Sequence, residues 1–137
     1  MSHRSKLNTH KAFQLALLLG ALHAATGIAS DSDYALSTVD KKPIPRSALF
    51  KLWQEIALKQ CDHAEERNNT SPQHCREIIA KRGPECEMAM IGNTPEIIDK
   101  KSVVKQIGRK YLRCALPYYF CNGIEVRTEE EARKICR

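Results

Sequence analysis

The sequence predicts an all-α fold, a small disulfide-stapled bundle of four or five helices with at most one short strand or hairpin. Three observations favour it. Apolar residues recur at helical spacing through most of the chain. Serine or threonine followed by proline, and one capping box, mark helix starts. Six cysteines, an even number, follow residue 60: Cys61, Cys75, Cys86, Cys114, Cys121 and Cys136. Such a set is typical of an exported protein held by disulfides.

Residues 1–30 are expected to be a signal peptide. Three basic residues precede a mostly apolar stretch, Ala12–Ala25, and the small residues Gly27 and Ala29 fit a cleavage site. The stretch is shorter than the roughly 20 apolar residues of a membrane span, so a stable membrane anchor is disfavoured. We therefore expect a periplasmic or extracellular protein, from either a bacterial or a eukaryotic host.

Cleavage also changes the charge of the protein. The whole chain carries a net charge of +6, and residues 1–30 hold three of its 22 basic residues and none of its 16 acids. The processed chain of about 107 residues then has a net charge of +3 and is long enough for one domain. This modest charge does not favour nucleic acid as a partner.

Residues 31–46 are expected to form a flexible N-terminal arm, because they are mostly polar and contain Pro43 and Pro45. A disulfide-rich helical domain then spans residues 47–137. Leucine, phenylalanine, tryptophan and alanine recur at helical spacing from about Ser47 to Arg67, which predicts the first helix.

The second helix is predicted over Pro72–Arg82. Ser71 suits the N-cap, where its hydroxyl accepts a backbone N–H, and proline is tolerated at the first helical position. Gly83 and Pro84 are expected to end this helix. Residues 84–91 would then form a separate short helix.

Thr94 and Pro95 repeat the cap-and-proline pattern and predict a helical stretch to about Leu116, with a break near Lys101 or Gly108 left open. Pro117 would end it.

A turn is expected at Asn122 and Gly123, and Ile124–Val126 could be one strand. Thr128 and Glu131 form a capping box that opens a last helix. In that helix the residues expected to face inward are Ala132, Ile135 and Cys136.

The disulfide connectivity stays open, because six cysteines allow fifteen pairings. Bridged Cα atoms lie about 4.4–6.8 Å apart, which disfavours joining Cys75 to Cys86 along one helix. Cys61 and Cys75 could meet across a helical hairpin. Cys121 and Cys136 could meet if the last helix folds back.

A zinc site is the main alternative use of these cysteines, since Cys61, His63, His74 and Cys75 could supply four ligands. Their spacing lacks the paired C-x2-4-C or H-x3-5-H pattern of zinc sites. We expect no metal and no cofactor. The chain also lacks G-x-S-x-G, H-E-x-x-H and a glycine-rich phosphate loop, so we do not expect an enzyme.

A candidate binding surface lies near the fourth cysteine. Basic residues recur every four positions at Lys101, Lys105, Arg109 and Arg113, which places them on one side of a helix. Three aromatic residues follow between Cys114 and Cys121. Solvated helix surface and ordinary core filling are the simpler interpretations. If a binding face exists, its expected residues are Arg109, Arg113, Tyr118, Tyr119 and Phe120.

The sequence therefore favours an exported helical protein that binds another protein, an acidic one, for example as an inhibitor or immunity factor against a cell-envelope enzyme. A carrier of a small apolar ligand and a hydrolase with an unrecognised carboxylate site are the alternatives. The oligomeric state is left open. Asn68 and Asn69 begin overlapping N-glycosylation sequons, which matter only in a eukaryotic host.

Overall fold

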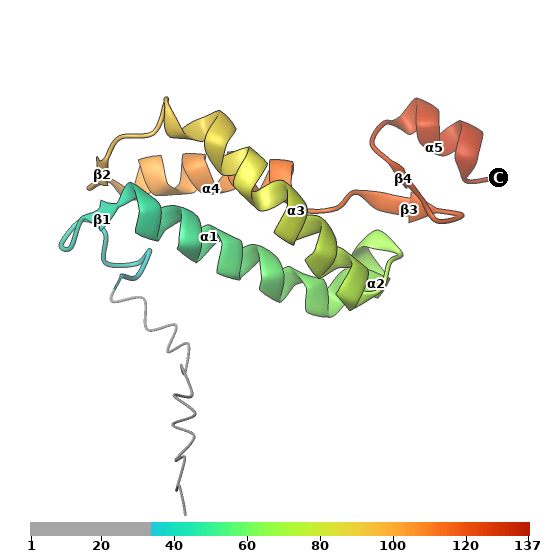
Figure 1. Ribbon diagram of the computed structural model, residues 1–137, viewed down its shortest axis with the longest axis horizontal. Coiled ribbons are helices and arrows are strands. Elements are labelled where there is room, and N and C mark those ends of the chain that lie inside the picture. The colour runs from blue at the N-terminus through green and yellow to red at the C-terminus, as the bar shows by residue number, and fades with distance from the viewer. Residues whose placement is uncertain (1–33) are drawn as a thin grey trace, which may run out of the picture. The chain divides into compact units, whose positions relative to one another are not determined.

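The computed structural model describes residues 34–137 (Figure 1). The expected signal peptide, residues 1–30, lies outside the described residues. The described chain is mostly helical, which confirms the predicted fold class in outline. None of its helices combines the length and the apolar composition that crossing a bilayer requires.

The elements follow one another in a simple order. They are β1 (Ile44–Pro45), α1 (Arg46–Gln60), the 3-10 turn η1 (Cys61–His63), α2 (Ala64–Asn68), α3 (Pro72–Ile91), β2 (Ile97–Ile98), α4 (Lys101–Ala115), β3 (Tyr119–Cys121), β4 (Ile124–Val126) and α5 (Glu129–Ile135). Helices α1, α3 and α4 pack against one another, with α4 behind the other two in Figure 1. The strands form two antiparallel pairs, β1 with β2 and β3 with β4, where at most one hairpin was expected.

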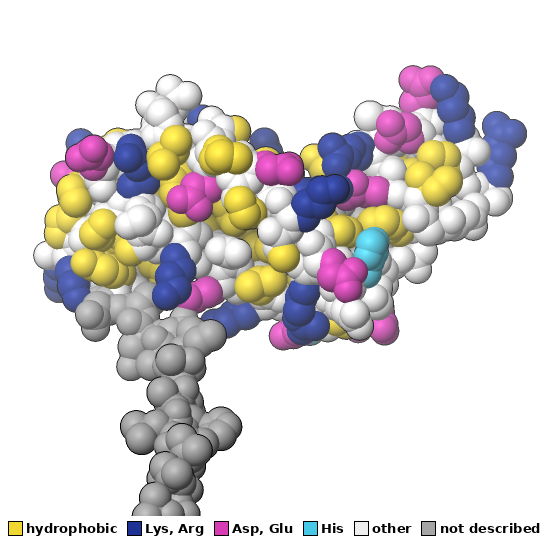
Figure 2. All heavy atoms as spheres, in the orientation of Figure 1, with side chains coloured by type: hydrophobic (Ala, Val, Ile, Leu, Met, Phe, Trp, Pro, Cys, Tyr) yellow, Lys and Arg dark blue, Asp and Glu magenta, His cyan; other side chains and the backbone are white. Residues whose placement is uncertain are grey.

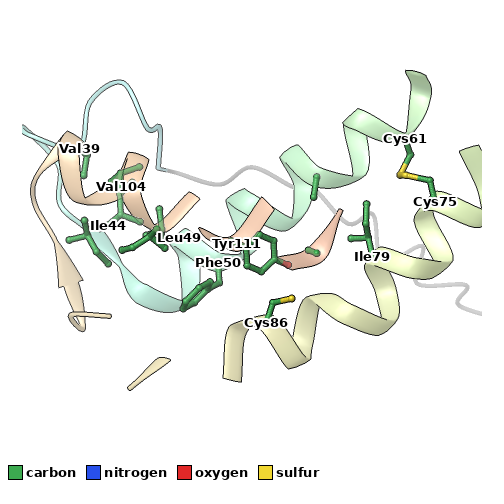
Figure 3. Close-up of a cluster of buried hydrophobic side chains, with 14 of the residues drawn as sticks. Val39, Ile44, Leu49, Phe50, Cys61, Cys75, Ile79, Cys86, Val104 and Tyr111 are labelled. Atoms are coloured by element: carbon green, nitrogen blue, oxygen red, sulfur yellow. A yellow bond between two sulfur atoms is a disulfide. The ribbon is translucent and has the colours of Figure 1, made fainter. Parts of the chain in front are cut away.

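The core lies between these three helices. Phe50 of α1 and Tyr111 of α4 are almost fully buried with ring centroids 6.0 Å apart, and Ile79 and Cys86 of α3 close the same space (Figure 3). Burying a large apolar side chain contributes about 1.5–3 kcal/mol, so this cluster supplies much of the driving force for folding.

Helix α4 is continuous past Gly108, which removes one of the two expected break points. Gly108 is buried against the indole of Trp53, and a Cβ at this position would overlap that ring. The glycine therefore allows α1 and α4 to approach closely. The other break point is real, because α4 begins at Lys101 and β2 precedes it. The Thr94 side chain donates to the Met90 carbonyl instead of capping a helix that starts there.

Helix α3 does not end at Gly83 as predicted but continues through Pro84 to Ile91. Gly83 packs under the Tyr111 hydroxyl, where a Cβ would lie 2.9 Å from the oxygen. Pro84 and Ala80 are both exposed, so water can satisfy the Ala80 carbonyl that loses its helical donor. A proline inside a helix costs about 3 kcal/mol, which the packing of α3 on α4 offsets.

The prediction of a flexible arm at residues 31–46 is corrected for the part of this segment that the structure describes. Val39 and Ile44 are fully buried, and Ile44 pairs with Ile98 between β1 and β2. Arg46 then donates to the carbonyl of Thr94 at 2.8 Å. Two apolar residues in a polar segment suffice to bring it into the core.

All six cysteines are paired, with Cys61–Cys75, Cys86–Cys114 and Cys121–Cys136 at Cα separations of 5.5, 5.9 and 5.1 Å. The two favoured pairings are confirmed, and the third joins α3 to α4. Each bridge contributes about 2–4 kcal/mol, mainly by restricting the unfolded chain. Disulfides of this number are typical of an oxidising compartment.

The C-terminal elements also follow the predicted local signals. Asn122 and Gly123 turn the chain with positive φ values of 51° and 78°. The capping box of Thr128 and Glu131 opens α5. The expected inward residues of α5 are only half-buried or exposed, however, because the helix packs mainly on β4 and has no buried residue.

Candidate functional site

The basic residues of α4 all lie on its exposed side, opposite the buried Val104, Ile107 and Tyr111. Lys101 has Asp40 at 3.8 Å. Arg109 and Arg113 have no carboxylate within ion-pair distance among residues 34–137. Their charges are therefore not neutralised within the described part of the chain.

Figure 2 shows a face of the molecule that carries charges of both signs. There, acidic and basic side chains alternate among scattered hydrophobic ones. Residues 100–124, by contrast, include no acid at all. A continuous acid-free segment produces a positive field that attracts negatively charged partners.

The aromatic loop divides between surface and interior. Tyr118 and Tyr119 remain 41% and 48% exposed, whereas Phe120 is only 7% exposed. The Phe120 and His74 rings pack in a T-shaped arrangement with their centroids 5.4 Å apart. Phe120 is therefore an anchor of the loop and not part of its surface. Ile124 on β4, 54% exposed, is an apolar surface residue that the sequence interpretation missed.

The side chains of two asparagines hold the loop that carries Tyr118 and Tyr119. The Asn68 side-chain amide donates to the Pro117 carbonyl at 2.7 Å, and the Asn69 amide donates to the Phe120 carbonyl at 2.8 Å. Asn69 adopts the left-handed conformation, with φ 52°, that ends α2. The two bonds hold both ends of the Tyr118–Tyr119 segment. They use the same nitrogen atoms that would carry glycans.

Glu125 is the polar centre that joins the hairpin β3–β4 to the helices. Its carboxylate accepts hydrogen bonds from both terminal nitrogens of Arg82, at 2.8 and 2.5 Å, so the two side chains form a bidentate pair. It also accepts the Tyr118 backbone N–H at 2.8 Å and an Arg127 N–H at 3.1 Å. The Arg82 hydrogen bond, aided by those from Tyr118 and Arg127, lowers the Glu125 pKa to about 2. Glu125 is thus ionised at neutral pH.

The same group of residues positions Tyr118. The Arg127 guanidinium lies 5.4 Å from the Tyr118 ring centroid, a cation–π contact, while Arg127 also pairs with Glu125. The backbone and the ring of Tyr118 are therefore both held. Sequence reasoning missed Glu125, although it is the only acid in residues 100–128. A single acid among many bases is a signal that it is already paired.

A small apolar groove lies between the last turn of α4 and the loop that follows. It has a volume of about 230 Å³ and is lined by Leu112, Arg113, Leu116, Pro117 and Tyr118. A larger hollow of about 440 Å³ lies along α3, and most of its lining is charged: His74, Glu77, Ile78, Lys81, Arg82 and Glu85. Neither hollow has the size and apolar lining typical of a lipid-like ligand site.

The zinc alternative is not supported at the residues that suggested it, since Cys61 and Cys75 are bonded to each other. Within residues 34–137 no three histidine, cysteine or acidic side chains are grouped as metal ligands.

Comparison of this chain with family models, curated proteins and solved structures finds no match. The functional argument therefore depends on the chain's own geometry.

Proposed function

We propose that this protein is an exported, non-enzymatic binding protein that recognises an acidic protein partner. The binding face consists of Arg109, Arg113, Tyr118 and Tyr119. The role that suits a small, stapled, exported domain is that of an inhibitor or immunity factor against a cell-envelope enzyme. Phe120, expected on this face from the sequence, is buried and anchors the loop that carries the two tyrosines.

The observation that carries the proposal is the exposed Tyr118, held by its backbone and its ring beside Arg113, which has no ion-pair partner among residues 34–137. Tyrosine and arginine are enriched among the residues that dominate binding energy. The Asn68 and Asn69 bonds and the Glu125 contacts fix the loop before any partner arrives. Prior ordering lowers the entropy cost of association, so a small face can still bind tightly.

The acidity of the partner follows from charge. Arg109 and Arg113 lie in residues 100–124, which contain no acid, and the acid that follows this segment, Glu125, is neutralised by Arg82 and Arg127. A partner with exposed carboxylates would be attracted to this face and oriented by it. An acidic substrate-binding cleft of an enzyme is one surface of this kind.

The compartment is inferred from two independent features. Three disulfides suit an oxidising environment. The residues before the described region carry the expected signal peptide, with cleavage after Ala29 or Ser30.

The experiment is affinity capture from host envelope or culture fluid with the oxidised protein, followed by measurement of Kd for the captured partner. The variant Arg109→Glu with Arg113→Glu should weaken binding about tenfold or more, since each reversal replaces attraction with repulsion. Lys51→Glu with Lys59→Glu is the matched control, because both lysines are exposed on α1 and unpaired among the described residues.

Both double variants should keep the wild-type melting temperature within a few degrees. Equal affinities for the wild type and the Arg109/Arg113 variant would rule out the proposed face. An equal loss in both variants would mean that net charge alone, and not this face, controls binding.

A further inference from the structure

The groove beside Arg113 has the dimensions of a receptor for a single side chain. Its volume of about 230 Å³ is below the roughly 300–1,000 Å³ of typical small-molecule pockets. Leu112 and Leu116 line it and are themselves packed against the hydrophobic core. Pro117 is buried and Tyr118 forms a wall, so most of the lining is carbon.

This groove is rigid for the same reasons that the loop is rigid. Asn68 bonds the carbonyl of Pro117, and Glu125 bonds the N–H of Tyr118. Arg127 lies over the Tyr118 ring, 5.4 Å from its centroid. The wall therefore remains in place when the groove is empty, which favours an apolar occupant that gains contact area without reordering the site.

The rim of the groove is positive. Arg113 belongs to the lining itself, and Arg109 lies one helical turn before it on the same side of α4. Glu125, which accepts the N–H of the lining residue Tyr118, already pairs with Arg82 and Arg127. A ligand that fills the groove with carbon and carries carboxylates on either side would match both features.

We propose that the groove receives one apolar side chain of the partner, from a segment in which acidic residues flank it and pair with Arg113 and Arg109. This inference rests on the proposed function and specifies the partner's contact segment. A protein segment is favoured over a lipid surface because the groove accommodates one side chain and the protein's remaining exposed apolar residues do not line it.

The test uses two capped, fluorescent hexapeptides, one with five acidic residues and one internal leucine and the other with serine in place of the leucine. Binding to the oxidised, ¹⁵N-labelled protein is followed by titration and by amide chemical shifts. The leucine peptide should bind about fivefold tighter than the serine peptide, since only leucine gains burial. The largest shifts should fall on residues 112–118.

Variants separate the apolar from the ionic contribution. Tyr118→Ala removes one wall and should abolish the preference for leucine. Arg113→Ala should weaken both peptides by a similar factor. Met88→Ala is the matched control for an exposed apolar residue outside the groove, since Met88 is 69% exposed on α3, and it should leave both affinities unchanged.

Equal binding of the two peptides, or shifts centred outside residues 112–118, would overturn the groove assignment. Tighter binding of phosphatidylglycerol vesicles than of the leucine peptide would also overturn it and point to a lipid surface. If the captured partner still depends on Arg109 and Arg113 in any of these cases, the proposed function stands without the groove. If that dependence is absent too, both fail.

Discussion

The helical core and the C-terminal hairpin region are held by different forces. In the core, large side chains such as Phe50 and Tyr111 are buried between α1, α3 and α4. In the hairpin region, residues 117–137, helix α5 has no buried residue, and the region is attached to the helices by Glu125, two asparagine amides and the buried Phe120. The Cys121–Cys136 bridge closes the region internally. The core therefore responds most to changes in side-chain volume and to loss of the Cys86–Cys114 bridge, whereas the hairpin region responds most to pH, to lost hydrogen bonds and to loss of the Cys121–Cys136 bridge. The proposed binding face lies where the two regions meet.

The largest effect is expected from truncation in the core. Tyr111→Ala should lower the free energy of unfolding by about 3–5 kcal/mol, because it leaves a cavity between Phe50 and Gly83. Ile124→Ala, on the exposed side of the hairpin, is the matched comparison and should change it by less than about 0.5 kcal/mol. Urea unfolding with the disulfides intact measures both. Similar losses in the two variants would contradict the division into two regions.

Removal of single disulfides should separate the two regions. Replacing Cys86 and Cys114 with serine should cost about 2–4 kcal/mol of global stability, since that bridge joins α3 to α4. Replacing Cys121 and Cys136 should instead increase amide hydrogen exchange mainly in α5 and β4 and leave exchange in the core nearly unchanged. Uniformly faster exchange in both variants would show that the molecule unfolds as one unit.

Acid should loosen the hairpin region before the core. The Glu125 pKa is about 2 in the folded protein against 4.5 without the fold, so its contribution is complete above about pH 4.5 and is lost as pH falls through about 2. The contribution is about 1–3 kcal/mol, reduced from the full linkage value because the pair is partly solvated. Glu125→Gln should remove most of this pH dependence. A stability curve between pH 5 and pH 2 that is unchanged in the variant would contradict the assignment.

The smallest effects are expected at the asparagine pair. Asn68→Ala and Asn69→Ala should each cost about 0.5–1.5 kcal/mol, the usual value of one hydrogen bond. Partner affinity should fall as well, because the Tyr118–Tyr119 loop is no longer fixed. Asn93→Ala, at an exposed position after α3, is the matched control. Unchanged affinity in both loop variants would mean that the fixed loop does not contribute to binding.

Prediction from the sequence succeeded where the determining interaction is local. The N-cap at Ser71, the turn at Asn122 and Gly123, and the capping box at Thr128 are all confirmed, and each depends on residues no more than a few positions apart. Val104, Ile107 and Tyr111 share the buried side of α4 for the same reason, since helical spacing places them together.

Prediction failed where a local signal competes with distant packing. Gly83 and Pro84 form a strong local stop signal, yet α3 continues because its far half packs on α4 and is bridged to it by Cys86. The segment before residue 46 is polar on average, yet Val39 and Ile44 are buried by elements more than 50 residues away. At the candidate site, the positions of Arg109, Arg113, Tyr118 and Tyr119 on the surface agree with the sequence interpretation. Phe120 does not, because a strand directs alternate residues to opposite sides.

The sequence by itself determined that this protein is helical, that its thiols suit an oxidising compartment and that its basic residues share one side of α4, because composition and short-range spacing decide these properties. Only the tertiary structure decided which cysteine meets which, that Glu125 pairs with Arg82, and that two asparagines hold the tyrosine loop. The two asparagine contacts join residues that are 49 and 51 positions apart. Such contacts become favourable only after folding has brought the partners together, because closing a long loop costs chain entropy.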